Sequence, residues 1–175
     1  MDTQYSNVAE ETLPPVRSTF LTVLCVLTFL GSAYGIFSGI STVLGADKVY
    51  KITQQSTAQV DREKAKKDLA EKNNPGAKFA IKMMDSVKDI TPQKIKQGGI
   101  GNALASVLTL IGALLMWRLN KKGFYIYIAG IIGAVAVPFI IFGTNNFLAT
   151  FGAVFPAFFG IIFIAMYAFN LKDMK

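Results

Sequence analysis

Four long apolar segments constrain the fold of this chain more than any other feature of its sequence. They cover residues 18–46, 98–117, 123–143 and 147–169, and none contains Asp, Glu, Lys, Arg or His. A helix crosses the hydrocarbon core of a bilayer with about 20 apolar residues, so every segment is long enough to span it. The sequence therefore predicts an all-α integral membrane protein, an antiparallel four-helix bundle with a long polar, partly helical loop between its first two helices.

Little of the chain remains for a second domain. Hydrophobic residues make up 52% of the 175 residues, and they are concentrated in the four segments rather than spread over short amphipathic pieces. The remainder is a polar N-terminal tail over 1–17 and a lysine-rich extramembrane loop over 47–97, so we expect one membrane domain over 1–175. The tail carries three acids against Arg17, the wrong sign for a secretory signal, and we expect an uncleaved first helix.

The chain is basic, with a net charge of +7. A basic balance suggests nucleic acid as a partner, but these cations flank the apolar segments, where Lys and Arg set orientation and meet lipid headgroups. We therefore expect the lipid bilayer as a partner and no nucleic acid. The connection 118–122 carries three cations and the connection 144–146 carries none. This asymmetry predicts that both termini face the cytoplasm.

No reactive constellation is visible in the sequence. Histidine is absent, the four segments hold no carboxylate, and Cys25 is the lone cysteine. Acid–base catalysis by histidine, haem ligation by histidine and His-containing metal sites are thereby excluded. We expect Cys25 to act as a small apolar residue of its helix. We expect no catalytic residue, no metal and no cofactor, and we predict that the protein is not an enzyme.

Glycines at intervals of four mark one face of the first segment. Gly31, Gly35 and Gly39 share this face, which lets another helix approach closely in lipid. The approaching helix belongs either to the same bundle or to another chain, and the spacing leaves both open. In either case we expect Gly35→Leu to disrupt packing. Gly152 and Gly160 mark a similar face of the fourth segment.

Polar residues inside the segments are few. We expect them to make hydrogen bonds between helices. They are Ser32, Ser38, Ser41, Thr42, Asn102, Ser106 and Thr109. Pro138 and Pro156 interrupt the third and fourth segments and free backbone carbonyls, which transporters use to coordinate ions, but no charged or amide group accompanies either proline.

Within the loop, residues 77–90 repeat apolar side chains at helical spacing. The apolar face includes Phe79, Met83 and Val87, and Lys82 falls largely elsewhere on the helix. The pattern predicts a short amphipathic helix. This helix lies either flat at the membrane interface or against the rest of its own loop, and the sequence leaves both arrangements open.

Further signals delimit the helices of the loop. Residues 55–72 are rich in helix formers and poor in apolar residues, and 73–76 form a break after them. Thr91 supplies a capping hydroxyl and Pro92 a first-turn proline, so a new helix is expected there. The lysines that follow are placed to snorkel to the headgroups. The residues expected at the lipid interface are Phe79, Lys82, Met83, Val87, Lys94 and Lys96.

Three stretches carry a resemblance. The chain reads TFLTVLCVLTFLG over 19–31, RLNKKGFYIYIAG over 118–130 and VPFIIFG over 137–143. These stretches resemble an uncharacterised family of small bacterial four-span membrane proteins, which implies a location in the bacterial inner membrane and brings no activity or functional residue. The layout is also similar to claudin-type tetraspans, but the paired loop cysteines and the tryptophan motif of claudins are absent.

These observations favour a structural or accessory subunit. It would pack through the glycine face of its first helix, against a membrane-protein partner or in a homo-oligomer, and contact lipid or a partner through the basic loop. The alternative is an oligomeric small-solute transporter or channel. Its walls would offer mainly hydroxyls, Asn102 and kinked backbone.

Overall fold

The computed structural model describes residues 17–55, 59–72, 74–88 and 90–174, and this part of the chain contains helices and no strand. The helices are α1 (Thr19–Gln55), α2 (Gln59–Lys72), α3 (Pro75–Lys88), α4 (Pro92–Trp117), α5 (Lys122–Phe142), α6 (Phe147–Phe169) and the short 3-10 helix η1 (Leu171–Asp173). Four of them, α1, α4, α5 and α6, are long and apolar enough to cross a membrane. The prediction of an all-α protein with four spans is confirmed.

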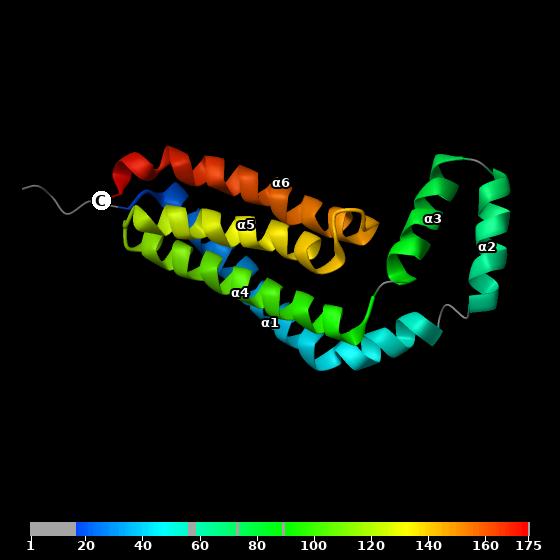
Figure 1. Ribbon diagram of the computed structural model, residues 1–175. Helices are drawn as coiled ribbons and strands as arrows, with labels where there is room; N and C mark the ends of the chain where they lie inside the picture. The colour runs from blue at the N-terminus through cyan, green and yellow to red at the C-terminus, as the bar shows by residue number, and fades with distance from the viewer. Residues whose placement is uncertain (1–16, 56–58, 73, 89, 175) are drawn as a thin grey trace, which may run out of the picture.

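The four long helices form a row rather than a closed square. Helix α1 packs on α4, α4 on α5 and α5 on α6 (Figure 1). The turns between α4 and α5 and between α5 and α6 are short, which makes neighbouring helices antiparallel. The first and last helices of the row, α1 and α6, meet at the end of the bundle where α1 begins and α6 ends, as Figure 1 shows; we call it the terminal end.

That terminal end is closed by a buried core. The core residues are Leu21, Leu24, Cys25, Met116, Phe124, Tyr127, Tyr167 and Met174. Two hydrogen bonds join α1 to α6 here: the hydroxyls of Thr28 and Tyr167 are 2.8 Å apart, and Ser18 Oγ donates to Asn170 Oδ1 at 3.0 Å. Cys25 is buried against α4, with its Sγ 3.7 Å from the carbonyl oxygen of Ala113. Apolar packing and hydrogen bonds thus both hold α1 and α6 in contact at the terminal end.

Two of the long helices exceed the apolar segments that predict them. Helix α1 continues beyond residue 46 to Gln55, because residues 47–55 contain neither Gly nor Pro to stop it. At about 1.5 Å per residue it is about 55 Å long, well over the hydrocarbon thickness of about 30 Å. Helix α4 begins at Pro92 rather than at residue 98, and the backbone N–H of Lys94 donates to Thr91 Oγ1 at 3.2 Å. The predicted start at Thr91 and Pro92 is confirmed.

The loop between the first two spans contains the helix pair α2 and α3 (Figure 1). The predicted break ends at Asn74, whose Oδ1 accepts a hydrogen bond from the backbone N–H of Ala77 at 2.7 Å, and Pro75 begins α3. Lys66 of α2 and Asp85 of α3 form an ion pair. The two helices therefore pack on each other.

Helix α3 also reaches the membrane bundle. The hydroxyl of Ser86 donates to the carbonyl of Lys82 at 2.9 Å and accepts from the backbone N–H of Phe147 at 3.0 Å. Asn146 Nδ2 donates to the carbonyl oxygen of Ser86 at 3.1 Å. These bonds attach the loop to the turn between α5 and α6, away from the closed terminal end.

Candidate functional site

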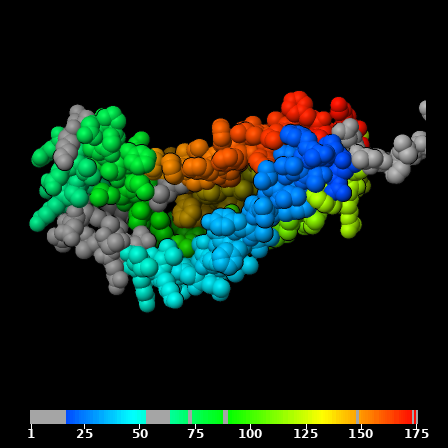
Figure 2. Space-filling model, turned by 180° about the vertical axis from the view of Figure 1, so that it is seen from behind, coloured from blue at the N-terminus to red at the C-terminus, as the bar shows by residue number. Residues whose placement is uncertain are grey.

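A groove opens between α1 and α6 where the two helices separate. Its volume is about 270 Å³. Figure 2 shows the opening from behind, with α5 visible between α1 and α6. Its lining combines small and polar residues of α1 and α4 with apolar residues of α1, α5 and α6. The first group includes Ser32, Gly35, Asn102, Ser106 and Thr109, and the second includes Leu27, Ile131, Phe159 and Phe163. We call this site the α1–α6 groove.

Hydroxyl groups of α1 and α4 form a hydrogen bond between these helices beside the groove. Thr109 Oγ1 donates to the carbonyl oxygen of Ser106 at 2.9 Å, so its single hydrogen is used there. Ser32 Oγ lies 2.9 Å from Thr109 Oγ1 and must be the donor in that pair. The predicted interhelical hydrogen bonding of Ser32 and Thr109 is confirmed. Thr42 instead donates within its own helix, to the carbonyl of Ser38 at 2.8 Å.

Asn102 makes the second polar link between α4 and α1. Its Nδ2 donates to the carbonyl oxygen of Gly35 at 3.2 Å, which confirms an interhelical bond. Within the described residues its Oδ1 has no hydrogen-bond partner. Ala134 also lines the groove, and its carbonyl cannot accept from residue 138, because Pro138 has no N–H. The amide oxygen of Asn102 is an acceptor that the described residues leave open.

The three glycines of the first span meet different surroundings. A Cβ added at Gly39 would lie 2.6 Å from the carbonyl oxygen of Gly99, so backbone meets backbone there. A Cβ at Gly35 would collide with the side chain of Ser106. A Cβ at Gly31 would meet nothing within 4 Å, and Gly31 lines the groove. Two of the three glycines thus lie against α4 of the same bundle, and one is left open.

The two glycines singled out in the fourth span also differ. A Cβ at Gly160 would collide with the side chain of Ile131 on α5, whereas one at Gly152 would meet nothing within 4 Å. Gly160 belongs to the α5–α6 contact and lines the groove. Gly152 is exposed and lies outside the groove.

Sequence reasoning missed three glycines at which helices cross most closely. A Cβ at Gly99 would lie 2.7 Å from the carbonyl oxygen of Gly39, and one at Gly112 would lie 2.6 Å from the backbone nitrogen of Tyr127. A Cβ at Gly123 would lie 2.5 Å from the carbonyl oxygen of Gly112. Helix α4 thus packs closely against α1 at Gly99 and against α5 at Gly112. The glycine cluster at the start of α4 was the available signal, but its partner is not visible in the sequence.

The apolar edge of α3 continues into the surface of α6. Phe79 and Met83 are 46% and 43% exposed. The ring of Phe79 packs edge-on against Phe147, with centroids 4.9 Å apart. From there a row of aromatic rings follows α6 through Phe151 to Phe155, with centroid spacings of 6.1 Å. One aromatic strip therefore joins the loop helix to the membrane-spanning surface.

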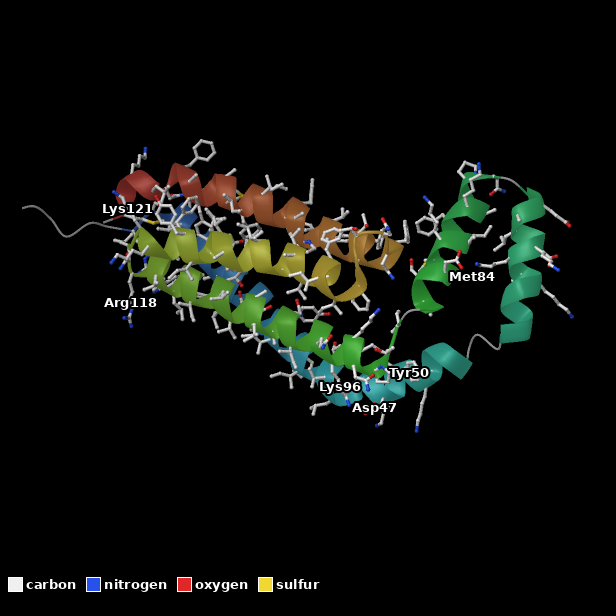
Figure 3. The ribbon with its side chains drawn as sticks, viewed as in Figure 1. Asp47, Tyr50, Met84, Lys96, Arg118 and Lys121 are labelled. Atoms are coloured by element: carbon white, nitrogen blue, oxygen red, sulfur yellow. The ribbon has the colours of Figure 1, made fainter. Side chains whose placement is uncertain are left out.

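The remaining residues predicted at the lipid interface lie around this junction and at the start of α4. Lys82 is exposed and borders a hollow of about 660 Å³ between α3 and the α5–α6 turn. Val87 and Lys94 are half-buried. Lys96 forms an ion pair with Asp47, with Nζ and Oδ2 3.2 Å apart, where α4 starts beside α1 (Figure 3).

The chemistry of the groove is hydrogen bonding without charge. Its lining holds hydroxyls, one side-chain amide and backbone carbonyls. Among the described residues, no group of three or more His, Cys, Asp or Glu side chains is placed to hold a metal ion. Comparisons of the chain with protein-family models, curated proteins and solved structures gave no match. Fold and site together describe a small four-span membrane protein with a groove between its first and last spans.

Proposed function

We propose that this protein is a non-enzymatic accessory subunit of the membrane that receives side chains of a partner's transmembrane helix in the α1–α6 groove. Asn102 carries the proposal, because it lines the groove and its amide oxygen has no donor among the described residues. A lipid chain offers no hydrogen-bond donor, whereas a Ser, Thr, Asn or Gln of another helix does. The partner is therefore a helix with such a residue rather than lipid alone.

The size of the groove defines how such a helix would bind. The groove of about 270 Å³ accommodates one or two side chains of that helix. Gly31, beside the groove, leaves space for the backbone of that helix to approach. The partner helix accordingly lies across the groove and inserts side chains into it.

The first experiment is purification of the tagged protein in mild detergent, followed by mass spectrometry and native mass. A foreign membrane subunit in fixed stoichiometry is expected. It must also depend on the groove. Gly31→Leu adds a side chain at the groove, where a Cβ meets nothing within 4 Å. Gly45→Leu is the matched control, since a Cβ at Gly45 also meets nothing within 4 Å and Gly45 is outside the groove.

We expect at least a tenfold loss of the partner with Gly31→Leu and no change with Gly45→Leu. Asn102→Leu should reduce recovery in the same direction, because it removes the amide oxygen. Equal recovery with all three variants would place the partner contact elsewhere. A homo-oligomer with no foreign subunit would contradict the accessory role.

We also propose that α3 lies at the membrane interface and contacts lipid. The aromatic strip from Phe79 into α6 and the exposure of Met83 support this placement. In a Cys25→Ser background, an environment-sensitive fluorophore at Met83→Cys should shift to the blue when the full protein enters vesicles. The same label at Lys64→Cys, on exposed α2, should not shift. Equal spectra would leave α3 in water.

For orientation we propose both termini in the cytoplasm, with the protein in the bacterial inner membrane. The cations of the α4–α5 turn, absent from the α5–α6 turn, support this orientation. In the same cysteine-free background, a membrane-impermeant thiol reagent added outside intact cells should label Lys64→Cys and not Lys121→Cys. The opposite pattern would reverse the orientation.

A transporter or channel is the second candidate. It is favoured by the hydroxyls of Ser32, Ser106 and Thr109 along the groove, which a second copy would have to close into a path. Proteoliposomes containing the purified protein should then conduct a small solute, and Gly31→Leu should block the flux. The accessory role predicts no flux at all.

A further inference from the structure

The terminal end of the bundle holds an arginine whose hydrogen-bonding capacity is incomplete. Arg17 precedes α1, and its Cζ lies 3.9 Å from the ring centroid of Trp117 at the end of α4. Its Nη1 is buried and has no hydrogen-bond partner. Among the side chains that the structure describes, this is the one buried nitrogen or oxygen left without a partner. Such a donor costs free energy while it stays unpaired, and a shift of the half-buried Arg17 side chain would bring it to an acceptor outside the chain.

The surroundings of Arg17 are strongly basic. Arg118, Lys121, Lys122 and Lys172 are exposed at the same end. Figure 3 shows Arg118 and Lys121 at the turn from α4 to α5, on the side of the bundle where α1 begins and α6 ends. In the part of the chain that is described, none of these cations takes part in an ion pair. Helices α1 and α5 begin here and α4 and α6 end here, so the helix dipoles largely cancel and the positive charge comes from the side chains.

We infer that this end binds the phosphate of an anionic membrane lipid, with Arg17 as its central contact. A guanidinium stacked on an indole ring keeps its planar fork of donors in place, and that fork matches the oxygens of a phosphate. Trp117 ends a membrane-spanning helix, a position where tryptophan lies at headgroup depth. The acceptor that Arg17 lacks is therefore at the level of lipid phosphates rather than free in solution.

The test is native mass spectrometry of the full-length protein with phosphatidylglycerol or phosphatidylcholine added. The wild type should retain phosphatidylglycerol at least tenfold better than phosphatidylcholine. Arg17→Gln should lose this preference, and Arg17→Lys should keep part of it, because lysine keeps the charge without the fork. Lys51→Gln is the control, an exposed cation of α1 at the other end of the bundle.

A second measurement does not depend on the yield of any variant. Phosphatidylglycerol should raise the melting temperature of the wild type and of Lys51→Gln. The rise in melting temperature should be smaller for Arg17→Lys. Retention that inorganic phosphate abolishes, or that Arg17→Gln leaves intact, would overturn the assignment. So would a Glu10→Gln/Glu11→Gln variant that loses stability as Arg17→Gln does, since the acceptor would then be a carboxylate of the same chain.

Discussion

The contact of α1 with α4 and its contact with α6 differ in kind. Against α4, backbone meets backbone: a Cβ at Gly39 would lie 2.6 Å from the carbonyl oxygen of Gly99. Against α6, the contact is confined to the terminal end and depends on side chains, such as the hydroxyls of Thr28 and Tyr167 at 2.8 Å. A backbone contact has no rotamers with which to adjust, whereas a side-chain contact does. We therefore expect the α1–α4 contact to hold the fold and the α1–α6 seam to adapt to a partner.

The largest effect on this comparison should come from Gly39→Leu. The obstructing atoms there are backbone of Gly99 and Ala103, so we expect a loss of about 3 kcal/mol in the free energy of unfolding. Gly35→Leu should lose about half as much on the same overpacking argument, because the Ser106 side chain is able to rotate away. The readout is heating with a thiol-reactive dye, since Cys25 is the lone cysteine and is buried.

Gly31→Leu is the control for this series. Nothing lies within 4 Å of its added Cβ, so its melting temperature should match that of the wild type. Three equal losses would mean that the glycine face acts as one unit. The distinction drawn between the two contacts of α1 would then be wrong.

The contact of α1 with α6 should contribute less to the free energy of unfolding than the contact of α1 with α4. Tyr167→Phe and Thr28→Val each remove one partner of the buried hydroxyl pair while keeping the side-chain shape. Hydrogen bonds between membrane helices contribute about 0.6 kcal/mol on average and up to about 1.7, so we expect a coupling of about 1 kcal/mol in the double-mutant cycle. Strictly additive single effects would show that this bond does not hold α1 to α6.

The spans were predictable because one property decides them. A segment of about 20 residues without charge has few alternatives to a membrane helix. The cap at Thr91 was also readable, since a hydroxyl before a helix satisfies its first free N–H groups. The C-terminal end of α1 was less predictable. Hydropathy indicates which residues lie within the bilayer, and residues 47–55 remain helical outside it.

The groove was not predictable from the same pattern. The glycine spacing identified a face of α1, but which glycine touches a neighbour depends on where α1 crosses α4, and Gly99 sets that point. The order of the helices in the row likewise depends on how the surfaces of two helices fit each other. In the sequence Arg17 is visible only as the cation of the N-terminal tail, whereas its stacking on Trp117, a hundred residues away, is a long-range contact that no local signal encodes.

A smaller effect is expected where α3 meets the bundle. Ser86→Ala removes the acceptor for the backbone N–H of Phe147. A hydrogen bond of this kind contributes about 1 kcal/mol, so amide exchange in α3 should become about fivefold faster while the global melting temperature stays nearly constant. Ser86→Thr keeps the hydroxyl and should exchange like the wild type. An unchanged exchange rate in Ser86→Ala would show that other contacts, such as Phe79 on Phe147, attach α3.

The smallest effect should come from the ion pair beside the α1–α4 contact. Lys96 and Asp47 are 3.2 Å apart, but their side chains are 43% and 64% exposed, so water and salt screen them. Lys96→Gln should cost less than about 1 kcal/mol, and high salt should erase the difference. The dye-detected melt at low and high salt measures it, with Asp47→Asn as the reciprocal variant. A salt-dependent loss larger than that of Tyr167→Phe would show that charge, and not glycine backbone alone, holds α1 against α4.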